Sequence, residues 1–164
     1  MIIEYNIPSP VDVKALNIFV RALCAYDVLW LRRNPSTPNI YESGVRYRTQ
    51  PVGVEQFKPI PMVIAAGEAD CDQLAPWRAA ELRERHGIKA LPEVRQMGKA
   101  LFHVYVRLPD GKVEDVSARL GMAIPKKIVA KGREILAQKG RRNRVSERVH
   151  TAGSLVLGAQ NYWG

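Results

Sequence analysis

The segment "ALFHVYVRLPDGKVEDVSARL", residues 100–120, constrains the fold most, because it predicts both a structure and its register. In "LFHVYVRL" apolar and polar side chains alternate from Phe102 to Leu108, the period-two pattern of a β-strand with one face toward a core. Pro109 and Asp110 suit a type I turn, and Gly111 suits the left-handed position of a three-residue loop. The segment therefore predicts a β-hairpin in which Leu108 pairs with Lys112.

This register determines which polar side chains of the hairpin meet. Counting back from the turn, Tyr105 lies opposite Asp115, and His103 lies opposite Ser117. His103 and Asp115 are then diagonal neighbours on one face, about 7–8 Å apart at the backbone, a gap that a hydrogen bond between their side chains can span. A two-residue loop would place them on opposite faces, so the inference depends on the turn type. The alternative is an ordinary solvated strand face.

A second segment, "GEADCDQLAPWRAAELRERHG" at residues 67–87, predicts a helix that begins at a thiol. Asp70 is a good N-cap, and Gln73 completes a capping-box pattern, so Cys71 takes the first helical position. The helix dipole favours a thiolate there, whereas the charges of Asp70 and Asp72 favour the thiol. Since the dipole is worth less than about 1 kcal/mol at an exposed site, a nearby imidazolium is needed to favour the thiolate.

The rest of this helix is suited to packing on a sheet. Ala75, Ala79 and Leu82 follow Cys71 at helical spacing and form a small apolar face. Pro76 lacks an N–H and predicts either a kink or a short separate first turn. Gly87 is expected just past the helix end, after His86.

The remaining chain gives weaker patterns. "SPVDVKALNIFVRALCAYDVLWLRRNP", residues 9–35, predicts a long buried helix capped by Ser9, with Cys24 inside its apolar stripe as a small hydrophobe. Residues 35–62 are rich in Pro, Gly and polar residues and predict irregular surface chain. Residues 126–139 predict a basic helix, followed by a Gly-rich tail.

Composition excludes several classes of protein. The chain has 164 residues, enough for one domain with a hydrophobic core, and only two cysteines. Two cysteines provide neither a disulfide framework nor a four-cysteine zinc site, and we expect no metal and no cofactor. Neither a signal peptide nor a run of about 20 apolar residues is recognisable. These features predict a soluble protein of the reducing cytoplasm without a membrane span.

The net charge of +9 is concentrated near the C-terminus. Residues 126–148 contain nine Lys or Arg against two Glu, a net charge of +7. Such a segment is either a solvated helix and tail or a binding surface for an acidic protein partner or nucleic acid.

The thiol, imidazole and carboxylate together suggest nucleophilic catalysis. A nucleophile needs a base, and the base needs an orienting group, which assigns these roles to Cys71, His103 and Asp115. The backbone N–H of Cys71 and the side chain of Gln56 are candidate donors to an oxyanion. His86 fits a structural place in the last helical turn, and His150 has no recognisable context.

These residues resemble the transglutaminase-like superfamily, within the broader papain-like cysteine fold. The matching segments are "GEADCDQLA" (67–75), "FHVYV" (102–106) and "GKVEDVSARLGM" (111–122), in the family's order of Cys, His and Asp. The sequence departs from the family at Val116, where Pro is common, and at Gln73, where a second acidic residue is common. The small size and basic tail are also similar to compact members encoded by bacteriophages, which would add association with a virion.

The resemblance implies an α+β fold in which a helix with Cys71 at its N-terminus packs on an antiparallel sheet. It implies a catalytic domain at residues 1–125, including the N-terminal helix, and a basic helix and tail at residues 126–164. The implied reaction is acyl transfer through a thioester on a protein or peptide substrate, ending in amide hydrolysis or transamidation.

Two other functions remain open from the sequence. One is a non-enzymatic structural or binding protein of a phage particle that keeps the fold and uses its basic tail. The other is an NlpC-type peptidoglycan peptidase, in which "DC" also opens a helix and a second His often orients the first.

Overall fold

The computed structural model describes residues 3–6, 11–50, 54–99 and 101–123 of the chain. Its contacts form one compact unit, Met1–Met122, and a second unit, Ala123–Gly164. The predicted basic helix and tail at residues 126–164, with His150, lie outside the described residues.

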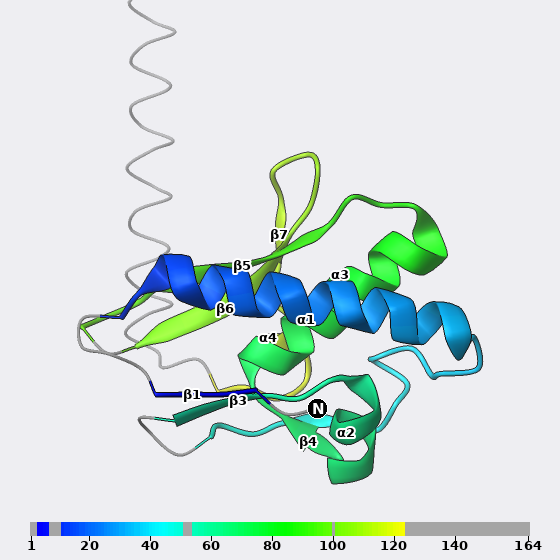
Figure 1. Ribbon diagram of the computed structural model, residues 1–164, viewed down its shortest axis with the longest axis horizontal. Helices are drawn as coiled ribbons and strands as arrows, with labels where there is room; N and C mark the ends of the chain where they lie inside the picture. The colour runs from blue at the N-terminus through cyan, green and yellow to red at the C-terminus, as the bar shows by residue number, and fades with distance from the viewer. Residues whose placement is uncertain (1–2, 7–10, 51–53, 100, 124–164) are drawn as a thin grey trace, which may run out of the picture. The chain divides into compact units, whose positions relative to one another are not determined.

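The compact unit has a mixed α+β fold, which confirms the predicted class (Figure 1). In chain order its elements are β1 (Ile3–Asn6), α1 (Val13–Arg33), β2 (Arg46–Tyr47), β3 (Val54–Phe57), α2 (Ile60–Ala66), β4 (Glu68–Ala69), α3 (Cys71–His86), β5 (Leu91–Gln96), β6 (Phe102–Arg107), β7 (Val113–Glu114) and α4 (Val116–Arg119). Strands β5, β6 and β7 form an antiparallel sheet in that order; β1 pairs antiparallel with β3, and β2 pairs parallel with β4. Helix α1 packs on both α3 and β5, and α3 also packs on β6.

Helix α1 begins later than predicted. Its N-cap is Asp12, whose carboxylate accepts hydrogen bonds from the N–H groups of Lys14 and Ala15, so the predicted cap at Ser9 is wrong. An aspartate caps a helix as well as a serine does, and here it satisfies two otherwise unpaired donors. Cys24 is fully buried, as predicted for a small hydrophobe in the apolar stripe.

The prediction of irregular chain at residues 35–62 is wrong in part: residues 35–45 and 48–50 are irregular, but β2, β3 and the start of α2 also lie within this range. The prolines suggested irregular structure, yet Pro61 falls in the first turn of α2, where a missing N–H costs nothing. The N-terminus of α2 is held from outside the helix, since Ile60 N donates to Oδ1 of Asp27 on α1 at 3.0 Å. Asp27 is only 1% exposed.

Helix α3 lies at the centre of the unit. Trp77, Leu74 and Ala79 are fully buried, and burial continues around the helix to Gln73 and Glu81 instead of following one face. The helix runs without interruption from Cys71 to His86, so a separate first turn before Pro76 is not formed. Gly87 takes the predicted left-handed conformation after the last turn, with φ 65°.

The hairpin register is confirmed. Val106 pairs with Glu114 and Arg107 with Val113, Leu108 N donates to Lys112 O at 2.9 Å, and Gly111 is left-handed with φ 81°. The second strand is shorter than expected because β7 ends at Glu114. Asp115 then caps α4 through a bond from Ala118 N at 3.0 Å, and Ser117 lies in that helix instead of opposite His103.

Candidate active site

Asp70 positions Cys71 at the start of α3. Its Oδ1 accepts the N–H of Cys71 at 2.6 Å, and its Oδ2 accepts the N–H of Gln50 at 2.8 Å, which links the helix start to the loop after β2. The predicted N-cap is thus confirmed, but the capping box is wrong. The amide of Gln73 donates to the carbonyl of Gln56 on β3, because that buried carbonyl lies within its reach.

The sulfur of Cys71 lies at the free edge of β6. The bond from Leu108 N to Lys112 O shows that the N–H groups of even-numbered residues point toward β7. Because β7 ends at Glu114, no strand among the described residues pairs with Val104 on this side. Its N–H instead interacts with the Cys71 sulfur and favours the thiolate.

The His103 ring is held by Asp115, as the hairpin register predicted. His103 Nε2 and Asp115 Oδ1 are 3.2 Å apart, and the histidine is 8% exposed, so it does not lie on a solvated strand face. Tyr105 contacts the same ring edge-on, with centroids 4.4 Å apart. Burial raises the pKa of Asp115, but the bonds from His103 and Ala118 N outweigh it, and the net effect lowers this pKa. Asp115 is therefore an ionised acceptor for the imidazole near neutral pH.

The structure brings the three predicted residues to one end of β6. Cys71 contacts Val104, the neighbour of His103 in the chain, and His103 contacts Asp115. In the described part of the chain, the Cys71 sulfur makes no hydrogen bond to the His103 ring. The imidazole is thus oriented by its carboxylate, without a hydrogen bond between sulfur and ring.

The environment of Cys71 favours the thiol. Burial raises the pKa of Cys71 well above its ordinary value, and the negative charges of Asp70 and Asp72 raise it further. The bond from Val104 N lowers this pKa but does not reverse the effect. The helix dipole alone therefore does not produce a thiolate, and a reaction at this sulfur needs a base to take its proton.

Two further carboxyl groups near Cys71 have raised pKa values. Burial raises the pKa of Asp72 well above its ordinary value, and the charge of Glu55 adds to this effect. Burial and the charge of Asp70 likewise raise the pKa of Glu55 to about 7. The charges of Asp72 and Glu55 both oppose ionisation of the Cys71 thiol.

Both predicted oxyanion donors are already engaged. The Cys71 N–H is bonded to Asp70, and Gln56 Nε2 donates to Glu4 Oε2 at 3.1 Å. Gln50 is better placed, because its Oε1 accepts the N–H of Gln56 at 3.1 Å and so fixes the amide plane. Its Nε2 makes only long contacts, 3.4 Å to Asp72 Oδ1 and 3.5 Å to Gln56 O. A weakly bonded, oriented amide can turn toward a stronger acceptor.

A pocket of about 550 Å³ opens beside the start of α3. Cys71, His103 and Asp115 do not line it, but Asp70 and Gln73, on either side of Cys71 in the sequence, do. Its other lining residues come from β3, α2, β4 and the neighbouring chain: Arg48, Thr49, Gln50, Gln56, Lys58, Ala66, Glu68 and Ala69. The pocket is therefore lined largely by amides and charges of both signs, which suits a polar chain such as a peptide.

Sequence reasoning missed Gln50, Glu55 and the burial of Asp72. Gln50 and Glu55 approach α3 through strand pairings between segments far apart in sequence, and no local pattern marks them. One sequence feature could have indicated that Asp72 is buried: it directly follows the thiol at the start of a helix whose later positions are apolar.

Comparison with known proteins identified no relative: no family model matches the sequence, and neither curated proteins nor solved structures give a match. In the described ranges, no group of three or more His, Cys, Asp or Glu side chains is arranged to hold a metal ion. No helix in the same ranges is both long and apolar enough to cross a bilayer.

Proposed function

We propose that this chain is a cysteine-dependent acyl-transfer enzyme with a transglutaminase-like, papain-like core. The observation that carries the proposal is the His103–Asp115 bond at the edge of β6 where the sulfur of Cys71 lies. A buried central helix that begins at the thiol and packs on β6 also agrees with such a core. The proposed substrate is a protein or peptide amide.

The environment of the thiol defines the first step. Because Cys71 rests as a thiol, His103 takes its proton as the sulfur attacks the amide carbonyl carbon. Asp115 stabilises the imidazolium that forms, and the Gln50 amide donates to the oxyanion. The C–N bond then breaks, the imidazolium gives its proton to the leaving amine, and the acyl group remains on sulfur as a thioester.

The second step releases the acyl group from the sulfur of Cys71. Neutral His103 removes a proton from water or from a second amine, which attacks the thioester carbonyl and releases the Cys71 thiol. Water gives hydrolysis and an amine gives transamidation. The carboxyl groups of Glu55 and Asp72 lie near the sulfur in both steps, and their charges oppose formation of a thiolate there.

The alternative functions have less support. The peptidoglycan-peptidase hypothesis expects a second histidine as orienting group, whereas a carboxylate holds His103 here. The binding-protein hypothesis relies on the basic segment at residues 126–148, which lies outside the described residues. Its proposed contact with an acidic partner, nucleic acid or a phage particle stays a prediction.

An activated ester tests the proposed reaction without a known substrate. With p-nitrophenyl acetate, we expect acetyl transfer to Cys71 with release of p-nitrophenolate, a thioester that hydroxylamine removes, and no such adduct in Cys71→Ala. Gln50→Ala is expected to slow acetylation by about 100-fold. Gln56→Ala serves as the control, because the side chain of Gln56 already donates to Glu4. Peptide mapping by mass spectrometry locates the adduct. An acetyl group on Cys24 instead of Cys71 would show that the proposal is wrong.

A further inference from the structure

Helix α3 carries a second functional side chain on the face that carries Cys71. Arg78 follows Cys71 by seven residues, close to two full turns, so the two side chains project from α3 within about 20° of each other. Arg78 is 14% exposed at its side chain. The same rigid helix therefore places a thiol at its first position and a largely buried guanidinium two turns later.

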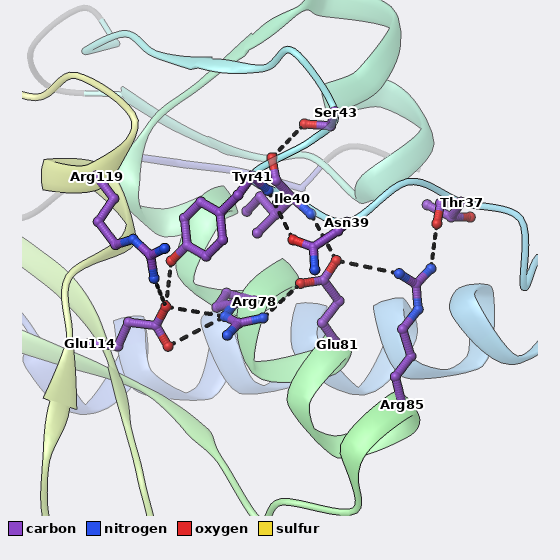
Figure 2. A network of polar contacts seen from close by, with 10 residues as sticks. All are labelled: Thr37, Asn39, Ile40, Tyr41, Ser43, Arg78, Glu81, Arg85, Glu114 and Arg119. Carbon is purple, nitrogen blue, oxygen red and sulfur yellow. Dashed lines mark hydrogen bonds and ion pairs between the residues drawn. The ribbon is translucent and has the colours of Figure 1, made fainter.

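Arg78 holds the residue that precedes Asp115 (Figure 2). Its Nε lies 3.2 and 3.3 Å from the two carboxylate oxygens of Glu114, the last residue of β7. Its Nη1 donates to Glu81 Oε2 at 3.1 Å, and Glu81 is fully buried. The planar guanidinium thus bridges two carboxylates at once, which an ammonium group on a flexible stem cannot reproduce.

Glu114 is held from two further sides. The hydroxyl of Tyr41 donates to Glu114 Oε1, and Arg119 Nη1 donates to the same oxygen at 3.0 Å. The guanidinium of Arg119 stacks on the Tyr41 ring at 3.7 Å from its centroid. Burial and the hydrogen bond to Glu114 raise the pKa of Tyr41, so its hydroxyl keeps its proton and remains a donor. These contacts leave the Glu114 side chain little freedom.

The consequence is a continuous connection between nucleophile and base. It runs from Cys71 along α3 to Arg78, across the ion pair to Glu114, through one peptide bond to Asp115, and on to His103. We propose that Arg78 is a positioning residue for the acyl-transfer site, which fixes the end of β7 against α3 and so sets where Asp115 holds the imidazole relative to the thiol. This inference rests on the proposed function.

Arg78→Lys tests the inference, because it keeps the charge and loses the two-carboxylate bridge. We expect hydrolysis of acetyl-Cys71, formed from p-nitrophenyl acetate, to slow by about 10- to 100-fold with the dissociation constant for the ester unchanged. The ¹⁵N shift of His103 Nε2 is expected to move in the same direction as in Asp115→Asn. A structural role alone would lower thermal stability without either change.

The matched control is Arg32→Lys. Arg32 also makes a two-oxygen ion pair with a glutamate, Glu84 on α3, at 3.0 and 2.9 Å, but this pair is far along the helix from Cys71. We expect the Arg32→Lys variant to have the deacetylation rate and the His103 ¹⁵N shift of the wild type. Glu114→Gln, which removes the charge but keeps the side-chain shape, is the second test variant if Arg78→Lys does not fold, and it should reproduce the slowing.

The outcomes separate the two proposals. If wild-type protein acquires no acetyl group on Cys71, the proposed function fails. Suppose that wild-type Cys71 is acetylated and the acetyl group is then hydrolysed. If Arg78→Lys or Glu114→Gln then has the same deacetylation rate and the same His103 ¹⁵N shift as Arg32→Lys, only the positioning role is overturned.

Discussion

In the His103→Ala variant, acetylation of Cys71 by p-nitrophenyl acetate is expected to be slow, and an acetyl group that does reach the sulfur is expected to remain there. Without the imidazole, no base is bonded to Asp115 to deprotonate the attacking water, so hydrolysis of the thioester should slow by about 100-fold or more. After prolonged treatment with p-nitrophenyl acetate and removal of the ester, intact-mass measurements over time would show the adduct persisting in the variant and disappearing in the wild type.

His86→Ala is the control for this prediction. His86 lies in the last turn of α3, at the opposite end of the helix from Cys71, and its loss should leave the decay of the adduct unchanged. Equal decay in His103→Ala and the wild type would remove His103 from the mechanism.

The free energy of unfolding is expected to fall as pH rises from about 5 to about 8. Burial raises the pKa of Asp27 to about 8, and although the bond from Ile60 N opposes this, the native protein holds a proton that the unfolded chain releases above about pH 4. The stability that this proton contributes is fully present at pH values below the pKa of Asp27 in the unfolded chain. It is lost as the pH rises toward the pKa of Asp27 in the native protein, by at most about 1.4 kcal/mol per pH unit.

Other carboxyl groups act in the same direction or outside this window. Glu55, with a pKa of about 7, and Asp72 also hold protons in the native state, and Glu55 contributes less because it is partly exposed to solvent. The lowered pKa of Asp115 makes the free energy of unfolding depend on pH only at more acidic values.

Urea denaturation at pH 5, 6.5 and 8 measures this dependence. Asp27→Asn keeps an oxygen acceptor for the Ile60 N–H but cannot titrate, so its stability should fall less steeply with pH than that of the wild type. A stability that is constant or rises over the range, or an unchanged slope in Asp27→Asn, would contradict the account of the buried carboxyl groups.

The features of the candidate site that depend on residues close together in the sequence could be predicted. Period-two alternation and the Pro109–Gly111 turn set the register of β6 and β7, and from that register the His103–Asp115 pair followed. Asp70 as N-cap and Gly87 as helix stop were likewise predictable, because capping depends on a few neighbouring residues.

Features that depend on distant segments were not predictable. The end of β7 at Glu114 follows from the cap that Asp115 gives α4, and the missing strand residue opens the edge where Cys71 lies. The Gln56 assignment failed because Glu4, on the paired strand β1, takes its side chain. Helix α2 was missed because the carboxylate that accepts its first N–H belongs to Asp27, 33 residues before Ile60.

The central claim, that His103 activates Cys71, is tested most directly by the site of iodoacetamide labelling near neutral pH. Burial raises the pKa of Cys24 to about 11, and it has no imidazole partner in the described part of the chain. The account predicts that Cys71 is carbamidomethylated first in the wild type, and that this preference is lost in His103→Ala. Labelling of Cys24 first, or the same preference for Cys71 without the imidazole, would contradict it.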